Sequence, residues 1–138
     1  MDTFICINQL EVGQKASSVK TVTESDVVSF AEATGDFNPI HLDDEYAKKT
    51  MFKERIAHGM LSAGYISAVI GNRLPGPGNI YMSQSLKFLA PVRFGDKITT
   101  TVEVTDIIHE KRRVVLRTTC TNQDGTVVVD GEALVKML

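Results

Sequence analysis

Four runs in the C-terminal half of the chain have the residue pattern of β-strands. They are rich in Thr, Val, Ile and aromatic residues, which favour extended backbone, and they cover residues 80–89, 97–108, 114–122 and 126–136. In the third run, Val114, Leu116, Thr118 and Cys120 alternate with a second set of side chains that includes Arg117. This period of two predicts a strand with one buried face.

The connections between these runs are short. Asp124-Gly125 separates the last two runs, and this dipeptide is typical of a tight β-hairpin. The basic cluster at residues 109–113 lies between the second and third runs and is expected to form a solvated turn, with contact to the phosphates of a ligand as the alternative. Consecutive strands joined by short turns pair antiparallel, so we predict an antiparallel sheet and not a crossover fold.

Residues 57–71 predict a buried helix. They are apolar nearly all round, and small residues such as Gly59, Ala63 and Gly64 stand among larger ones such as Leu61 and Ile66. The Pro/Gly-rich segment at residues 72–79 ends this helix. A sheet that wraps around the helix would cover its apolar circumference, so the predicted fold class is α+β with an antiparallel sheet around a central buried helix.

Two shorter helices are predicted before this central one. Thr23 followed by acidic residues has the pattern of an N-cap, apolar residues continue at helical spacing to Ala33, and Gly35 suits the C-terminal end. Asp43 can cap a second helix that runs to about Lys49. The segment between them contains Pro39, which predicts a bent, irregular backbone.

Length and composition indicate one domain over residues 1–138. The chain is 43% hydrophobic, with 15 Lys and Arg against 17 Asp and Glu, so no charge excess suggests binding to nucleic acid or to an anionic membrane surface. Cys6 and Cys120 form no CxxC or Cys/His pattern, which argues against a disulfide framework or a zinc site. The apolar run at residues 4–7 is too short for a signal peptide, and we expect a cytoplasmic protein.

Candidate chemistry lies on both sides of Pro39. Asp36 and His41 are five positions apart on the predicted bent segment, where a turn can bring both side chains to one point. A carboxylate beside an imidazole suits proton transfer at neutral pH. The alternative is ordinary turn chemistry, because Asp and Asn beside Gly and Pro are common in loops.

A resemblance to a known family adds to this evidence. The run at residues 30–41, with Ala47 after it, resembles the hydratase motif of the MaoC-like, (R)-specific enoyl-CoA hydratases. The block Ile56-Ala57-His58-Gly59-Met60-Leu61 resembles the start of that family's central helix. Further similarity brings the resemblance to about residues 10–137, with no departure at the motif positions.

The resemblance implies a hot-dog fold, assembly into homodimers by joining sheets edge to edge, and a role in fatty acid metabolism. It also implies reversible hydration of a trans-2-enoyl-CoA to an (R)-3-hydroxyacyl-CoA. Asp36 and His41 would hold one water, with Asp36 as the first choice of base and His41 as its partner, although the two roles can be exchanged. Asn38 would brace the turn.

Gly59 is the candidate for stabilising the thioester oxygen. It opens the predicted buried helix, where amide protons lack acceptors within the helix and a glycine lets an oxygen approach the backbone. A packing role for this glycine is the alternative. Ser67 aligns by resemblance with a serine that shapes the active site, or it hydrogen-bonds within the helix to the carbonyl of Ala63. His58 is expected to be a hydrogen-bonding residue at the helix end.

Two other classes compete with a hydratase. An acyl-CoA thioesterase on the same fold commonly uses a carboxylate on the central helix, but residues 59–71 contain no Asp or Glu. A non-catalytic acyl-CoA-binding module would need no pair such as Asp36 and His41. We therefore expect a lyase that acts on acyl-CoA thioesters without a cofactor or metal and without nucleic-acid or membrane partners.

Overall fold

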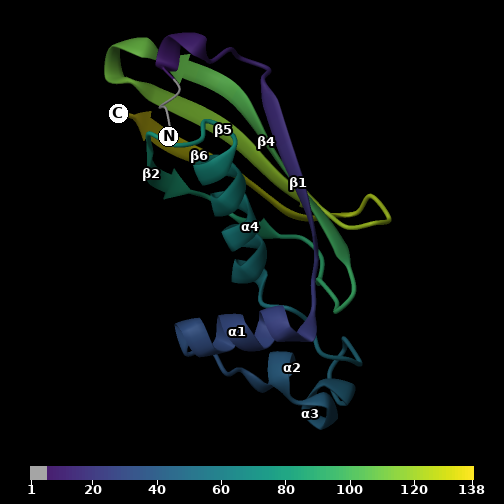
Figure 1. Cartoon of the computed structure of the whole chain (residues 1–138). Coiled ribbons are helices and arrows are strands. Elements are labelled where there is room, and N and C mark those ends of the chain that lie inside the picture. Colours follow the sequence, from purple (N-terminus) through teal and green to yellow (C-terminus); the bar gives the residue numbers. More distant parts are fainter. Residues whose placement is uncertain (1–5) are drawn as a thin grey trace.

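The computed structural model describes residues 6–138 and arranges them as one antiparallel sheet with helices beside it and at one end (Figure 1). The α-helices are α1 (Glu24–Thr34), α2 (Pro39–Leu42), α3 (Asp44–Lys48) and α4 (Gly59–Asn72). The strands are β1 (Lys15–Thr21), β2 (Asn79–Gln84), β3 (Lys87–Phe88), β4 (Lys97–Ile108), β5 (Arg113–Thr121) and β6 (Val127–Met137). Two short 3₁₀ helices are η1 (Ile7–Gln9) and η2 (His109–Lys111). The apolar run at residues 4–7 lies partly outside the described residues.

The sheet confirms the antiparallel prediction. Its strands lie in the order β1-β4-β5-β6-β2, and β3 also pairs with β6. All pairings are antiparallel, and β2 pairs with β6, the last strand of the chain. The turns at η2 and at Asp124-Gly125 join β4 to β5 and β5 to β6, and Gly125 adopts a φ of +79° in the second of them.

One face of the sheet forms the core with α4. Alternate residues of β4 and β5 are buried, as the period of two predicts. From the helix, Ser62, Tyr65, Ile66, Val69 and Ile70 are buried, at the i, i+3, i+4 spacing of one helical face. Apolar surface is buried along the whole interface between α4 and the sheet. This interface is therefore the main stabilising feature of the fold.

The prediction that α4 is buried all round is wrong for the single chain. Met60, Gly64, Ser67, Ala68 and Gly71 are exposed. The reason is that the sheet is a single layer and covers one side of the helix, whereas the apolar composition of residues 57–71 was taken to need cover on every side. Apart from Met60, which is 53% exposed, the exposed face carries small residues.

The helices α1, α2 and α3 lie together beyond one end of α4 (Figure 1). The α1 prediction is confirmed, because Thr23 and Asp26 form a reciprocal capping box and Gly35 ends the helix with a φ of +80°. Asp43 caps α3 by accepting hydrogen bonds from the amides of Glu45 and Tyr46. These caps fix where each short helix starts and how the chain passes from one to the next.

The predicted strand at residues 80–89 is interrupted. Between β2 and β3, the Ser85 carbonyl oxygen lies 1.9 Å from the position that a Cβ of Gly131 would occupy. The Ser85 amide donates to the Glu132 carbonyl, and the Ser85 hydroxyl accepts from the Glu132 amide. This crossing ends β2 and redirects the chain, and Phe88 in β3 then packs against the start of α4.

The cysteines are not bonded to each other. Cys6 is exposed and Cys120 is buried, and burial raises the pKa of the Cys120 thiol, which suits an unreactive core residue. Among the described residues, no helix combines the length and apolar character required to span a membrane.

Candidate active site

Asp36 lies on the loop that follows α1. Its amide donates to the Thr34 hydroxyl, and its carboxylate Oδ1 accepts from the Asn38 amide at 3.2 Å. The side chain is 50% exposed, and its other carboxylate oxygen, Oδ2, lies 4.0 Å from Nε2 of His58. Short-range hydrogen bonds of this kind fix an Asx turn without needing burial.

His41 lies on α2, so the prediction that it sits on irregular backbone is wrong. Pro39 occupies the first position of this four-residue helix, where its missing amide proton costs nothing. Asn38 is the N-cap and accepts from the Ile40 amide. The proline therefore starts a helix after the bend, and the bend itself is confined to residues 35–38.

The ring of His41 is oriented by a backbone carbonyl. Its Nδ1 lies 2.8 Å from the carbonyl oxygen of Ile56, to which it must donate a proton. In the neutral ring, Nε2 then carries the lone pair and can accept a proton. Burial lowers the pKa of His41 from its ordinary value of 6.5, so the neutral ring dominates at pH 7.

Asp36 and His41 meet as the sequence predicts, and His58 joins them. One ligand atom from each of the three side chains lies within 4.8 Å of the other two. This spacing allows one water to hydrogen-bond to both Asp36 and His41. The pair can therefore hold and activate a single water molecule.

The same three side chains are the one group of His, Cys, Asp and Glu donors within residues 6–138 that could hold a metal ion. His41 suits this role, because metal-binding histidines commonly donate their other ring proton to a carbonyl. His58 suits it less well, since its Nε2 is 3.1 Å from the Asp36 carbonyl oxygen and donates there. Proton transfer fits all three groups as they stand.

Arg55 holds the backbone of this region together. Its Nε donates to the His41 carbonyl at 2.7 Å, and its guanidinium pairs with Glu24 of α1 at 2.6 Å. The guanidinium also lies over the ring of Phe94, and the side chain is only 10% exposed. Arg55 thus joins α1, α2 and the loop before β4.

Gly59 begins α4, as predicted, so its amide has no acceptor within the helix. A Cβ built on Gly59 would lie 2.7 Å from two atoms of the Phe88 ring. The packing role and the oxyanion role are therefore compatible at this position. The ring leaves no space for a side chain, and the bare backbone amide remains available to an incoming oxygen.

A cavity of about 450 Å³ opens between the start of α4 and the segment after β3. His41 and Gly59 both contribute to its wall, together with Ser62, and its other wall residues are apolar. These are Phe52, Ile56, Ala57, Met60, Phe88, Leu89, Ala90, Pro91, Val92 and Val129. A cavity with two polar reaction groups at its edge and apolar walls suits a ligand with a reactive head and a hydrocarbon tail.

Three predicted residues are outside the cavity wall: Asp36, which lies next to His41, and also Asn38 and Ser67. Asn38 serves as the α2 N-cap and does not reach the cavity wall. Ser67 is on the exposed face of α4, and among residues 6–138 it makes no side-chain hydrogen bond that would join it to Asp36 or His41. The roles of Asn38 and Ser67 in binding a substrate stay predictions.

The sequence interpretation missed three contributors. His58 forms a hydrogen bond at the start of α4 as expected, but its contact with the Asp36 carbonyl and its stacking on His41 were not predicted. The Ile56 carbonyl that orients His41 is a backbone group and leaves no mark in the sequence. Phe88 comes from a distant strand, and nothing in its local sequence predicts its contact with Gly59.

Comparisons with known proteins agree with this geometry. A model of the MaoC-like domain family matches residues 8–125. An (R)-specific enoyl-CoA hydratase of Rhodospirillum rubrum is 59% identical over 126 residues, which are 91% of this chain and 87% of that protein. A 3-hydroxybutyryl-CoA dehydratase of Methylorubrum extorquens is 56% identical over 93% of this chain and 81% of its own length.

Solved structures of related proteins also have a closely similar fold. The unliganded R-hydratase PhaJ1 of Pseudomonas aeruginosa superposes with a TM-score of 0.90 at 50% identity, covering 95% of this chain and 84% of that one. This similarity confirms the predicted hot-dog architecture of an antiparallel sheet packed against a central helix.

Proposed function

The chain belongs to the MaoC-like domain family, and from that premise we propose that it reversibly hydrates trans-2-enoyl-CoA to (R)-3-hydroxyacyl-CoA. The enzyme is a lyase of acyl-thioester metabolism. The observation that carries the proposal is the meeting of Asp36 and His41 at the edge of an apolar cavity whose wall also contains the Gly59 amide.

In the proposed reaction, a water held between Asp36 and His41 attacks C3 of the substrate. The orientation of His41 leaves its Nε2 as a proton acceptor, which favours His41 as the base and Asp36 as the group that orients the water. This exchanges the first assignment made from the sequence. The proton removed from water returns to C2, so the net change is the addition of one water across the double bond.

Gly59 stabilises the charge that develops between these two steps. As oxygen bonds to C3, the electrons of the C2–C3 double bond move toward the thioester oxygen and give it enolate character. The Gly59 amide at the N-terminus of α4 donates to that oxygen, and the helix dipole adds to the effect. The apolar cavity keeps other water away from the enolate and receives the acyl chain.

The proposal is tested with a short trans-2-enoyl-CoA, by following the conjugated absorbance and free thiol in one sample. A hydratase removes the absorbance without releasing thiol, and chiral analysis then shows the (R)-3-hydroxyacyl product. Thiol release at the same rate as absorbance loss would contradict hydration. No change in either signal, across several chain lengths, would favour a binding module.

The thioesterase alternative has less support. Helix α4 carries no acidic side chain in the sequence GMLSAGYISAVIGN, so the carboxylate typical of that mechanism is missing from the helix. The Asp36 carboxylate lies on the loop before α2. A water held there is proposed to face C3 of an acyl chain in the cavity, while the thioester carbonyl points at α4.

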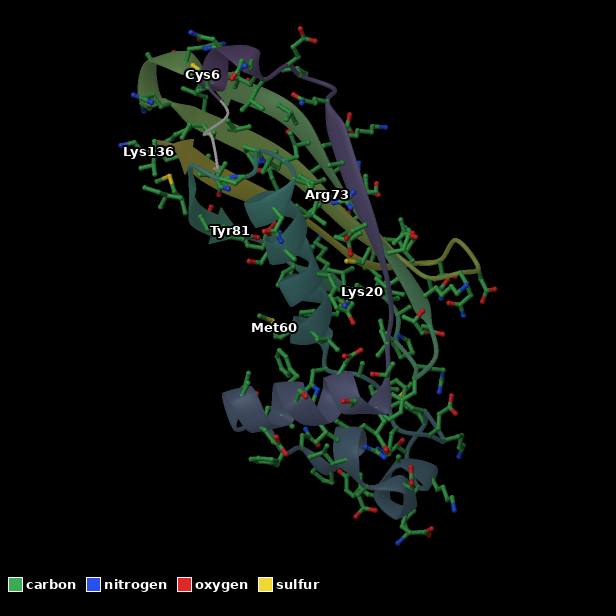
Figure 2. All side chains as sticks on the ribbon, viewed as in Figure 1. Cys6, Lys20, Met60, Arg73, Tyr81 and Lys136 are labelled. Atoms are coloured by element: carbon green, nitrogen blue, oxygen red, sulfur yellow. The ribbon has the colours of Figure 1, made fainter. Side chains whose placement is uncertain are left out.

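We propose that the protein is a homodimer. Exposed apolar side chains gather on β2, with Ile80, Tyr81 and Met82 exposed to 47%, 37% and 43%. Met60 on α4 and Tyr81 on β2 lie on the side of the molecule that faces away from β1 (Figure 2). Since β2 pairs only with β6, its other edge is open within the described residues, and pairing with an identical strand would cover both the edge and the apolar side chains.

The dimer would also give Ser67 a role. Ser67 lies on the exposed face of α4, which a partner across β2 would cover, so any part it plays in shaping a site depends on assembly. Sedimentation at micromolar concentration should give twice the mass of the chain. A single species with the monomer mass would contradict the proposed assembly and leave Ser67 without a site.

A further inference from the structure

His58 lies at the centre of the site without reaching the cavity wall. Only 3% of its surface is exposed, and its ring contacts two others. The ring of His41 stacks on one side with 3.8 Å between centroids and an angle of 28°, and the ring of Phe30 lies 4.7 Å away. The cavity is lined by residues on both sides of His58 in the sequence but not by His58 itself.

The hydrogen bonds of His58 define its tautomer. Its Nε2 lies 3.1 Å from the carbonyl oxygen of Asp36 and must therefore donate. Its Nδ1 is buried and has no hydrogen-bond partner among the described residues. The neutral Nε2–H form satisfies this arrangement, because a proton on Nδ1 would be buried without an acceptor.

Three simpler roles do not account for these contacts. His58 is the N-cap residue of α4, but its side chain makes no capping hydrogen bond. Its Nε2 proton is donated to the Asp36 carbonyl and its Nδ1 is buried, so neither ring nitrogen is free to exchange a proton with a ligand in the cavity. A metal ligand at Nε2 would have to release the Asp36 carbonyl and move its proton to Nδ1, where no acceptor exists.

We propose that His58 is a positioning residue for the water-activating pair: its Nε2–H fixes the backbone of Asp36, and its ring fixes the plane of His41. This inference rests on the proposed hydratase function. The two catalytic groups come from different segments, a loop and a four-residue helix, and His58 contacts both of them from the first position before α4.

The same residue also sets the catalytic pair relative to Gly59. His58 directly precedes Gly59 in the chain. Its hydrogen bond to Asp36 and its stacking on His41 therefore fix the positions of both groups relative to the Gly59 amide, which is proposed to hold the thioester oxygen. A displacement of about 1 Å between reacting groups can cost on the order of 100-fold in rate. Loss of His58 should therefore slow the chemical step more than it weakens binding.

The test compares two variants that each keep one contact. His58→Phe keeps a flat ring against Phe30 and His41 but removes the donor to Asp36, whereas His58→Gln keeps a donor near the Nε2 position but removes the ring. Each should lower kcat by on the order of 10- to 100-fold, with KM changed by less than about threefold. Tyr65→Phe is the matched control, because its hydroxyl is also buried on α4 without a partner and its loss should leave kcat unchanged.

A double-mutant cycle separates positioning from a general loss of structure. If His58 acts through Asp36, His58→Phe should cost much less in the Asp36→Asn background than in the wild type. Equal losses in both backgrounds would overturn the proposal, as would kcat within about twofold of wild type in both single variants. Wild-type turnover in the same assay tests the hydratase function separately.

A measurement on the unmodified protein covers the case in which the variants do not fold. Nitrogen-15 NMR of the histidine side chains at pH 7 should show His58 with its proton on Nε2 and a bare Nδ1. It should show His41 with its proton on Nδ1. A bare Nε2 on His58 would contradict the contact with the Asp36 carbonyl and overturn the proposal.

Discussion

The contact between α4 and the sheet and the active-site segment, residues 35–58, are ordered by different means. In the first region, side chains such as Ile66, Val102 and Leu116 are completely buried. In the second, most residues are exposed or half-buried, with Ala47, Ala57 and His58 as the buried exceptions. The segment keeps its shape through directed hydrogen bonds from side chains to backbone, made by residues such as Asn38 and Arg55.

This difference separates stability from activity. Burial is spread over many residues and is not directional, so no single core side chain defines the position of a reacting group. A side chain that bonds one carbonyl fixes a position but contributes only about 1 kcal/mol to folding. Substitutions in the active-site segment should therefore reduce turnover, and substitutions in the core should reduce the free energy of unfolding.

The largest expected effect is on turnover in Asp36→Asn and His41→Gln. Each should lower kcat by about 10² to 10⁴, the range for losing a general acid or base. Their losses should not add in the double variant, because both groups act on one water. Near-native turnover in either single variant would remove that residue from the mechanism.

Stability measurements on Asp36→Asn and His41→Gln test whether the active-site segment contributes little to the stability of the fold. Asp36 is half exposed and His41 half-buried, so the free energy of unfolding should change by no more than about 1.5 kcal/mol in denaturant titrations. A loss of several kcal/mol would show that the active-site segment supports the fold, and the separation between the two regions would fail.

The converse substitution is Ile66→Ala in the core. Ile66 is completely buried, so the truncation should lower the free energy of unfolding by about 2–5 kcal/mol. Ile66→Val, which removes one methylene, should cost about 0.5–1.5 kcal/mol. At a temperature where both proteins are folded, kcat per folded molecule should stay within about threefold of wild type.

Gly59→Ala tests the point where the two regions meet. The added Cβ would lie 2.7 Å from Phe88, which is 53% exposed and can move, so the stability loss should be small. We expect kcat to fall by about 10- to 100-fold, because a methyl group hinders approach to the amide. Gly59→Ala combined with Phe88→Ala removes the clash, and recovery of full activity in that double variant would show that packing alone explains the glycine.

The smallest expected effect is the change of kcat/KM with pH that follows from the lowered pKa of His41. His41 must be neutral to accept a proton, and burial lowers its pKa below 6.5, so the acid limb of kcat/KM should have its midpoint below pH 6.5. Since the folded pKa lies below the unfolded one, the folded protein also loses stability as pH falls below about 6.5. An acid limb with its midpoint at or above pH 6.5 in the rate profile would contradict the lowered pKa of His41.

The regular parts of the fold could be predicted from local patterns. The period-two alternation in β5 and the caps at Thr23 and Asp43 depend on neighbours within a few residues, and the structure has them as expected. The break between β2 and β3 could not be predicted, because it results from the approach of Ser85 to Gly131, 46 positions later. The exposed face of α4 was missed because composition does not show which sides of a helix a sheet covers.

The candidate site was predicted in part. Asp36 and His41 are near in sequence, so their meeting needed only a turn. The interpretation of Pro39 failed because a proline that forbids the interior of a helix is favoured at its first position. The contacts of His58, the Ile56 carbonyl and Phe88 are set by tertiary packing, which the local sequence does not contain.

The most direct test of the account is the position at which water enters the substrate. In water enriched in oxygen-18, a trans-2-enoyl-CoA should give a product with the label in the hydroxyl group at C3 and with the thioester intact. Asp36→Asn and His41→Gln should give little labelled product in the same time. Label found in a released carboxylate, together with free CoA, would contradict a site that directs water at C3.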